Sequence, residues 1–168
     1  MSATTKIARE SIGRRFDHTE CLLCGTENPW SLGLTFTADN AGRVCTVLKA
    51  DERLQGYAGM LHGGVSAALL DATMTHCLFH RGVRAVTADL RVRYVKAVPL
   101  NADIELRAWV TIETPPLYRL KAELALGGDV LVWAQATFCE IKKEETDATY
   151  HAKVKNSSSD LDRDGTSL

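Results

Sequence analysis

The sequence of 168 residues lacks an excess of either charge and lacks a long apolar run. Lysine and arginine total 20, aspartate and glutamate total 21, and the formal net charge is -1. Because a chain so close to neutrality exerts no long-range attraction on phosphates, we expect neither a nucleic-acid partner nor an anionic membrane partner. No apolar stretch reaches the ~18 residues that a membrane-spanning helix requires. We therefore expect no association with a membrane.

The sequence also lacks the features of an exported, disulfide-bonded protein. Residues 1–15 are polar and contain no apolar block of signal-peptide length. The cysteines are odd in number and scattered along the chain, at Cys21, Cys24, Cys45, Cys77 and Cys139. An odd, scattered set favours a reducing compartment over a disulfide framework, so we expect a cytoplasmic protein.

The composition predicts one folded domain with polar ends. A chain of this length corresponds to a single domain, because domains average ~150 residues. We expect residues 1–17 to form a flexible arm or one short helix, and residues 18–141 to form the domain. Residues 142–168 are polar and rich in serine and aspartate. They offer too little apolar surface to offset the entropy cost of ordering, so we expect a disordered tail.

The hydrophobic pattern predicts an α+β fold with one long helix. Residues 60–79 are apolar on nearly every face, which is typical of a buried helix. Alternating patterns predict about six strands, at 32–36, 43–50, 85–94, 102–112, 118–126 and 130–141. Short turns between the later strands favour a mostly antiparallel sheet. Since no second helix is available to cover this helix, the sheet must wrap around it.

One acidic residue lies within the predicted buried helix. Between Arg53 and Arg81 the only formally charged side chain is that of Asp71. A buried carboxylate is costly unless it is hydrogen-bonded, paired or functional. Two interpretations remain open at this point. Asp71 is either a structural residue satisfied by a nearby backbone group or threonine hydroxyl, or a reactive acid with a perturbed pKa.

A glycine-rich segment directly precedes the same helix. Residues 56–64 include four glycines, and the first turn of a helix carries unpaired N–H groups that can stabilise a developing oxyanion. In the alternative interpretation, His62 only caps the helix and the glycines only turn the chain. Gly64 and Asp71 are separated by ~10 Å along a helix axis, which is too far for both to contact one carbonyl. We therefore predict an obligate dimer in which each site combines the first turn of one helix with Asp71 of the other.

These residues resemble the hotdog-fold thioesterases, in particular their PaaI-like branch. The resemblance is carried by the HGG-x6-D motif, formed here by His62, Gly63, Gly64 and Asp71. Flanking segments GYAGMLHGGVSAALLDATM and TADLRVRYVKAVP match as well, as does the opening segment CLLCGTENPWSLGLTF. Together they cover about 120 of the 168 residues. The resemblance implies a hotdog fold, a homodimer or homotetramer, and hydrolysis of an acyl-CoA to free acid and CoA without a cofactor.

The resemblance also implies roles for individual residues. Gly63 and Gly64 would supply a backbone N–H that polarises the thioester carbonyl. Asp71 would act as a general base for water or as a nucleophile that forms a mixed anhydride. Thr87 would help to place the carboxylate and the water, and His62 would orient the loop or form a hydrogen bond near the carbonyl.

Substrate-binding residues are less clearly marked. Many relatives carry a polar residue six positions before the histidine, where this chain has Gly56. Either Gln55 reaches the site through a shift of one residue or that function is absent. Tyr57 and Met60 would line the acyl tunnel, or they serve only for packing.

Two arginines of the strand predicted at 85–94 form a second candidate for substrate binding. Arg91 and Arg93 alternate with apolar residues and therefore lie on one face of the strand. On that face they would contact the CoA phosphates, or they belong to a solvated surface.

Two patterns have part of the spacing of a metal site. Cys21 and Cys24 form half of a zinc knuckle, with His18 three residues upstream, and His76 and His80 are four residues apart on the predicted helix. A structural zinc site needs four ligands, and neither pattern supplies them. We therefore expect no metal.

The motifs of other enzyme classes are missing. The sequence has no G-x-S-x-G elbow, no P-loop, and no G-x-G-x-x-G after a strand. The absence of a Ser-His-Asp triad does not exclude thioester hydrolysis, because a thioester carbonyl is already electrophilic. Two alternatives stay open: a non-catalytic acyl-CoA-binding protein with a structural Asp71, and a hotdog dehydratase or hydratase. The second lacks support, because the HFPxxPxxPG-type loop of that branch is not present.

Overall fold

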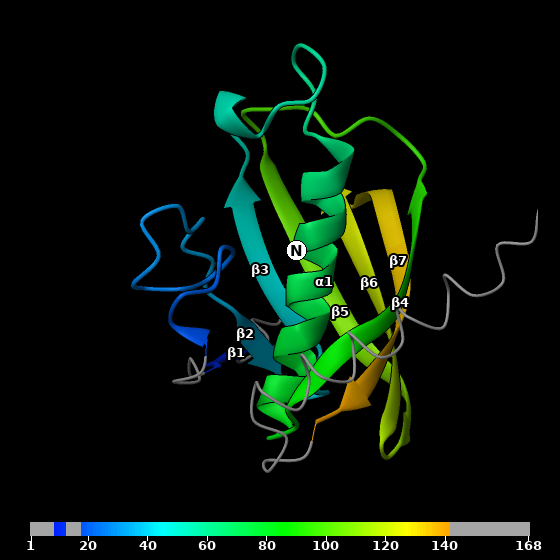
Figure 1. Ribbon diagram of the computed structural model, residues 1–168. Coiled ribbons are helices and arrows are strands. Elements are labelled where there is room, and N and C mark those ends of the chain that lie inside the picture. The colour runs from blue at the N-terminus through cyan, green and yellow to red at the C-terminus, as the bar shows by residue number, and fades with distance from the viewer. Residues whose placement is uncertain (1–8, 13–17, 142–168) are drawn as a thin grey trace, which may run out of the picture.

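The computed structural model describes residues 9–12 and 18–141, in which one long helix lies across one face of a single sheet (Figure 1). The helix is α1 (Gly63–His80), preceded by a short 3-10 helix, η2 (Glu52–Leu54). The strands are β1 (Arg9–Ser11), β2 (Thr37–Asp39), β3 (Val44–Lys49), β4 (Ala85–Tyr94), β5 (Asp103–Thr114), β6 (Leu117–Leu126) and β7 (Asp129–Glu140). The tail predicted at 142–168 and most of the predicted arm lie outside the described residues.

The sheet has seven strands in the order β1-β2-β3-β5-β6-β7-β4, and all neighbours are antiparallel. This confirms the predicted α+β architecture of one helix wrapped by an antiparallel sheet. Two strands, β1 and β2, lie outside the predicted ranges, and β1 pairs with β2 although the sequence of β1 is polar. The strand predicted at 32–36 is wrong, since β2 begins only at Thr37. The backbone of segment 32–36 instead pairs with a preceding loop: the Leu32 N–H donates to the Leu22 carbonyl, and the Leu34 N–H donates to the Leu23 carbonyl.

Helix α1 is the centre of the hydrophobic core, as its uniformly apolar sequence predicts. Leu69, Leu70, Met74 and Leu78 are at most 1% exposed, and they pack against the sheet. Burial of side chains of this size is the dominant favourable contribution to folding. Among the described residues, no helix is both long and apolar enough to cross a membrane.

Strand β4 forms one edge of the sheet. One side of it pairs with β7, and no described strand pairs with the other side. Most of its side chains are exposed, and exposed apolar residues lie along it and just beyond it, at Val86, Tyr94 and Val95. A long unpaired edge strand is a template for pairing with another chain. This edge also carries the residues that contact the functional positions of α1.

Candidate functional site

The single acidic residue of α1 meets a hydroxyl group from the edge strand. Thr87 Oγ1 donates a hydrogen bond of 2.7 Å to Asp71 Oδ1. Thr87 pairs in register with the buried Phe138 of β7, so its side chain shares the face of the sheet that is covered by α1. The structure therefore brings together two of the residues that the sequence marked as catalytic.

The environment of Asp71 shifts its protonation toward neutral pH. Burial raises the pKa of the Asp71 carboxyl above its ordinary value of 3.8, and the hydrogen bond from Thr87 partly opposes this shift by favouring the charged form. Within residues 9–12 and 18–141, Thr87 is the one side chain that donates to this half-buried carboxylate. No described residue donates a hydrogen bond to Oδ2, and a carboxylate of raised pKa is well suited to accept a proton from water.

The first turn of α1 is capped by the histidine of the glycine-rich segment. His62 Nδ1 accepts a hydrogen bond of 2.9 Å from the Gly64 N–H, and the His62 carbonyl accepts one from the Ser66 N–H. His62 therefore caps helix α1, as the capping interpretation predicts. Among the described residues, the N–H groups of Gly63 and Val65 have no acceptor. Of the two glycines implicated by the sequence, Gly63 is therefore the one whose N–H is available to a ligand.

Tyr94 connects the edge strand to the same turn. Its hydroxyl donates a hydrogen bond of 2.8 Å to the Gly63 carbonyl oxygen. Strand β4 thus contacts α1 at two functional positions, through Thr87 near its start and through Tyr94 at its end. Sequence reasoning missed Tyr94. Its presence in the matching segment TADLRVRYVKAVP was the only available signal.

The glycine-rich loop is held closely around His62. A Cβ atom at Gly56 would lie 3.1 Å from His62 Cα, which gives a physical reason for glycine at this position. Gln55 Oε1 accepts a hydrogen bond from the Gly59 N–H. In this chain Gln55 therefore stabilises its own loop, and the structure does not bring it to Asp71 of the same chain.

A pocket of about 870 Å³ opens beside the first turn of α1. Its apolar lining comes from the loop before β2, from η2 and from the first two turns of α1, and includes Leu22, Leu23, Trp30, Leu32, Leu54, Val65 and Ala68. His62 and Gly64 also contribute to its wall. Sequence reasoning did not assign residues 22–32 to a pocket, although they belong to the segment CLLCGTENPWSLGLTF that carries part of the resemblance.

The residues predicted to line an acyl tunnel are placed differently. Tyr57 is 80% exposed at the tip of its loop. Met60 is half-buried and forms an isolated β-bridge with Pro99. Neither of them belongs to the wall of this pocket.

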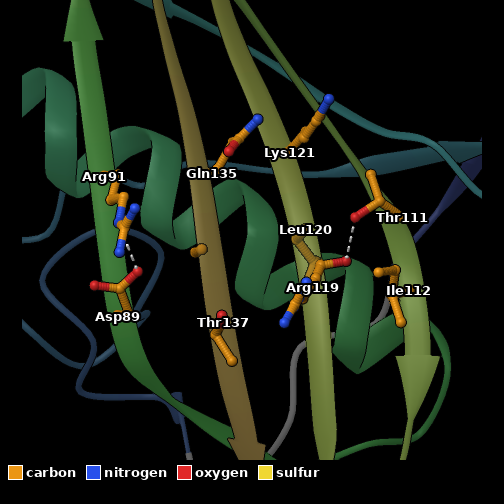
Figure 2. Close-up of a pocket in the computed structure, with 10 residues that line it drawn as sticks. Asp89, Arg91, Thr111, Ile112, Arg119, Leu120, Lys121, Gln135 and Thr137 are labelled. Carbon is orange, nitrogen blue, oxygen red and sulfur yellow. Dashed lines mark hydrogen bonds and ion pairs between the residues drawn. The ribbon is translucent and has the colours of Figure 1, made fainter.

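Arg91 and Arg93 project from the opposite face of the sheet. In register with Gln135 and Trp133 of β7, both are exposed. Arg91 lines a recess of about 520 Å³. Figure 2 shows Asp89 beside the guanidinium of Arg91, with α1 behind the sheet. The Arg91 Nε and Asp89 Oδ2 atoms are 3.3 Å apart. The structure therefore does not bring the two arginines to Asp71 of the same chain.

Comparison with known sequences identifies the segment around this site. The family model of the thioesterase superfamily matches residues 58–112, which include His62, α1 and β4. Human acyl-coenzyme A thioesterase 13 is 32% identical over 79 residues, which cover 46% of this chain and 56% of the human protein. The chain thus spans about half the length of the curated relatives that it matches.

Comparison with solved structures identifies the fold. A thioesterase superfamily protein superposes with a TM-score of 0.68 at 24% identity, covering 72% of this chain and 60% of that chain. A hypothetical thioesterase from Streptococcus pneumoniae, solved with coenzyme A, superposes with a TM-score of 0.58 at 20% identity, covering 60% and 80%. The pneumococcal protein was also solved as alanine variants of one aspartate and of one threonine. The predicted resemblance to the hotdog thioesterases is confirmed.

Proposed function

We propose that this chain, which has the fold of the thioesterase superfamily, hydrolyses an acyl-CoA to the free acid and CoA. The observation that carries the proposal is the Asp71 carboxylate, which is half-buried, held through Oδ1 by Thr87, and without a described hydrogen-bond donor at Oδ2. The acyl-CoA thioesterases among its relatives support the substrate class. The aspartate and threonine varied in the pneumococcal protein are 16 positions apart, the separation between Asp71 and Thr87.

In the proposed reaction Asp71 acts as a general base. Asp71 Oδ2 accepts a proton from water, and the resulting hydroxide attacks the thioester carbonyl carbon. The N–H of Gly63 donates a hydrogen bond to the oxyanion that develops on the carbonyl oxygen. When the tetrahedral intermediate collapses, the C–S bond breaks and the CoA thiolate takes up the proton from Asp71. The products are the carboxylic acid and CoA, and no cofactor is consumed.

The proposed site is shared by two subunits that pair through β4. Asp71 and Gly63 of one chain lie too far apart along the helix to contact one carbonyl. Antiparallel pairing of two β4 strands about a two-fold axis would set Thr87 of one chain opposite Tyr94 of the partner subunit. Since Tyr94 binds the carbonyl of Gly63, this pairing would carry the partner's first turn toward Asp71. The open edge of β4 and its exposed apolar residues support such an interface.

The apolar pocket beside the first turn is the proposed site of the acyl chain. Its walls are mainly leucine, valine, alanine and tryptophan side chains, whose burial of an alkyl or aryl group would be favourable at about 0.8 kcal/mol for each CH₂ removed from water.

Hydrolysis is tested with a panel of acyl-CoAs by following the release of free thiol. We expect turnover by the natural chain and a loss of ~10²-fold or more for Asp71→Asn, which removes the base but keeps the side-chain size. Tight binding of an acyl-CoA without cleavage of any substrate would instead establish the non-catalytic alternative. Single turnover in ¹⁸O-labelled water tests the general base, since this route places the label in the product acid and leaves Asp71 unlabelled.

The role of the Gly63 N–H is tested by Gly63→Pro. Proline suits the first position of a helix, and His62 before it has the extended backbone that proline requires, with φ -62° and ψ 133°. The substitution therefore removes one N–H with little strain. Gly63→Ala is the matched control, because it keeps the N–H and its Cβ would lie no closer than 3.5 Å to the Tyr94 ring. We expect a loss of kcat for the proline variant only.

The shared site is tested by mixing the two defects. In a dimer with shared sites, a heterodimer of an Asp71→Asn chain and a Gly63→Pro chain contains one intact site. Random association would restore about a quarter of the natural activity in a 1:1 mixture. If co-expressed chains show no restored activity while native mass spectrometry confirms heterodimers, each site lies within a single subunit.

A further inference from the structure

We propose that His18, Cys24 and His76 bind a zinc ion that fixes the loop forming one wall of the pocket. Their ligand atoms, two imidazole nitrogens and one sulfur, all lie within 4.8 Å of one another. His18 Nδ1 is 3.2 Å and His76 Nε2 is 3.4 Å from Cys24 Sγ. In a tetrahedral zinc site with Zn–N near 2.0 Å and Zn–S near 2.3 Å, nitrogen and sulfur ligands are about 3.5 Å apart. Both nitrogen–sulfur distances therefore match such a site, and the two imidazole nitrogens lie within 4.8 Å of each other.

The chemistry of the three donors selects zinc among common ions. Imidazole together with thiolate suits Zn²⁺, whereas Mg²⁺ and Ca²⁺ prefer oxygen ligands. Cys24 and His76 are each only 2% exposed, and a buried thiolate is costly without a compensating cation. A zinc ion would provide that compensation.

The local structure holds the three side chains in place. The His76 ring stacks on Phe36 with a centroid distance of 3.7 Å, and Phe79 packs edge-on against the rings of His76 and His18. These contacts fix the planes of both imidazoles. Packing that fixes ligand orientation before the metal binds is typical of metal sites.

The turn that carries Cys24 has features of a metal-binding knuckle. The Leu23 N–H donates to Cys21 Sγ, and the Gly25 N–H donates to the Cys21 carbonyl. A side chain at Gly25 would collide with the backbone of Thr19 and Cys21, so the turn requires glycine there. Cys21 Sγ is not part of the cluster. The protein therefore supplies three ligands, and a water molecule would complete the four-coordinate site.

The position of the cluster indicates what the ion would do. His76 lies in the buried part of α1, while Cys24 lies 52 residues earlier, next to the loop that lines the pocket. Zinc would therefore tie this loop to the core helix. It would not take part in the chemistry, because neither Asp71 nor Thr87 belongs to the cluster.

Metal content tests the proposal independently of the enzymatic activity. The full-length chain, purified without chelators and dialysed, is analysed for zinc by mass spectrometry and then loaded with Co²⁺. We expect one zinc per chain and a near-ultraviolet thiolate-to-cobalt charge-transfer band. Cys24→Ser and His18→Gln should lose both the zinc and the band. His80→Gln, on the same helix but exposed and outside the cluster, and Cys139→Ser should keep both.

A second measurement covers the case in which a cluster variant fails to fold. The natural chain is stripped with a chelator, and its melting temperature is recorded before and after Zn²⁺ is restored. We expect a rise on restoration in the natural chain and in His80→Gln. If the natural chain holds no zinc, gives no charge-transfer band with Co²⁺ and is not stabilised by Zn²⁺, the three side chains form only a hydrogen-bonded cluster and the proposal is wrong. Retention of zinc by Cys24→Ser would also overturn it.

Discussion

The hydrogen bond from Thr87 to Asp71 gives a sharp test of the proposed general base. Thr87→Val removes the hydroxyl but keeps the volume and the β-branched shape that suits a strand. The variant loses the 2.7 Å hydrogen bond to Oδ1, so the carboxylate is no longer held in one orientation. The pKa of Asp71 should also rise further, because burial then acts without the opposing hydrogen bond.

The magnitude follows from the exposure of Thr87. A hydrogen bond to a charged group contributes ~1.5–3 kcal/mol. Thr87 is exposed in the single chain, so we take the lower end of this range, which is the smaller effect. A loss of ~1.4 kcal/mol in transition-state stabilisation corresponds to a tenfold fall in kcat/KM.

The assay is the pH profile of kcat/KM with one acyl-CoA substrate. For Thr87→Val we expect a fall of about tenfold at neutral pH and an acidic limb displaced to higher pH. Thr87→Ser keeps the hydroxyl and should restore both the rate and the limb. An unchanged profile for Thr87→Val would refute the role of the hydroxyl, and an equal loss in Thr87→Ser would assign the effect to strand packing.

Three further predictions, the last with a control variant, test the site and its surroundings. Asp71→Asn should raise the melting temperature at neutral pH although it abolishes turnover. Burial raises the pKa of Asp71 from 3.8, so the natural chain loses stability as the pH rises through the pKa of the folded state. In acid, where Asp71 is protonated in both states, the difference in melting temperature between variant and natural chain should vanish. Calorimetry across this range checks the sign, and a destabilised variant at neutral pH would contradict it. Tyr94→Phe removes the hydrogen bond to the Gly63 carbonyl and should lower kcat/KM several-fold, by the ~1 kcal/mol of one hydrogen bond, without loss of Asp71 titration. Gly56→Ala would place a Cβ 3.1 Å from His62 Cα, and we expect a melting temperature ~2–4 °C lower. Gly59→Ser is the comparison for backbone strain alone, because φ is +75° there but no atom lies within 4 Å of the added Cβ.

The sequence predicted the central part of the fold because the relevant signals are local. Helix α1 is apolar on almost every face, so its burial follows from residues 60–79 alone. Strand β4 matches its predicted bounds of 85–94, since alternation and flanking turns mark it directly. Asp71 was recognisable as the single charge in the helix, and its partner Thr87 was identified through the resemblance.

The parts that the sequence did not predict depend on distant contacts. Strand β1 is polar, and it is a strand only because the edge of β2 offers it hydrogen bonds. The segment 32–36 has the alternation of a strand, yet its backbone pairs with residues 22 and 23 in a loop that forms the pocket wall. In the same way, Cys24 and His76 are 52 positions apart. The Cys21–Cys24 pattern and the His76–His80 pattern each lack ligands when they are taken separately.

The same reasoning explains why we propose an active site shared by two chains. A helix with a rise of 1.5 Å per residue cannot bring its first turn and its middle to a single carbonyl. Strand β4 binds both of these positions, through Tyr94 and Thr87, and its outer edge is unpaired in the described structure. Pairing of this edge with its own copy would satisfy the backbone groups of β4 and bring the two halves of the site together. In this chain the edge strand therefore links the stability of the proposed dimer to its catalysis, and a substitution that blocks edge pairing should remove both.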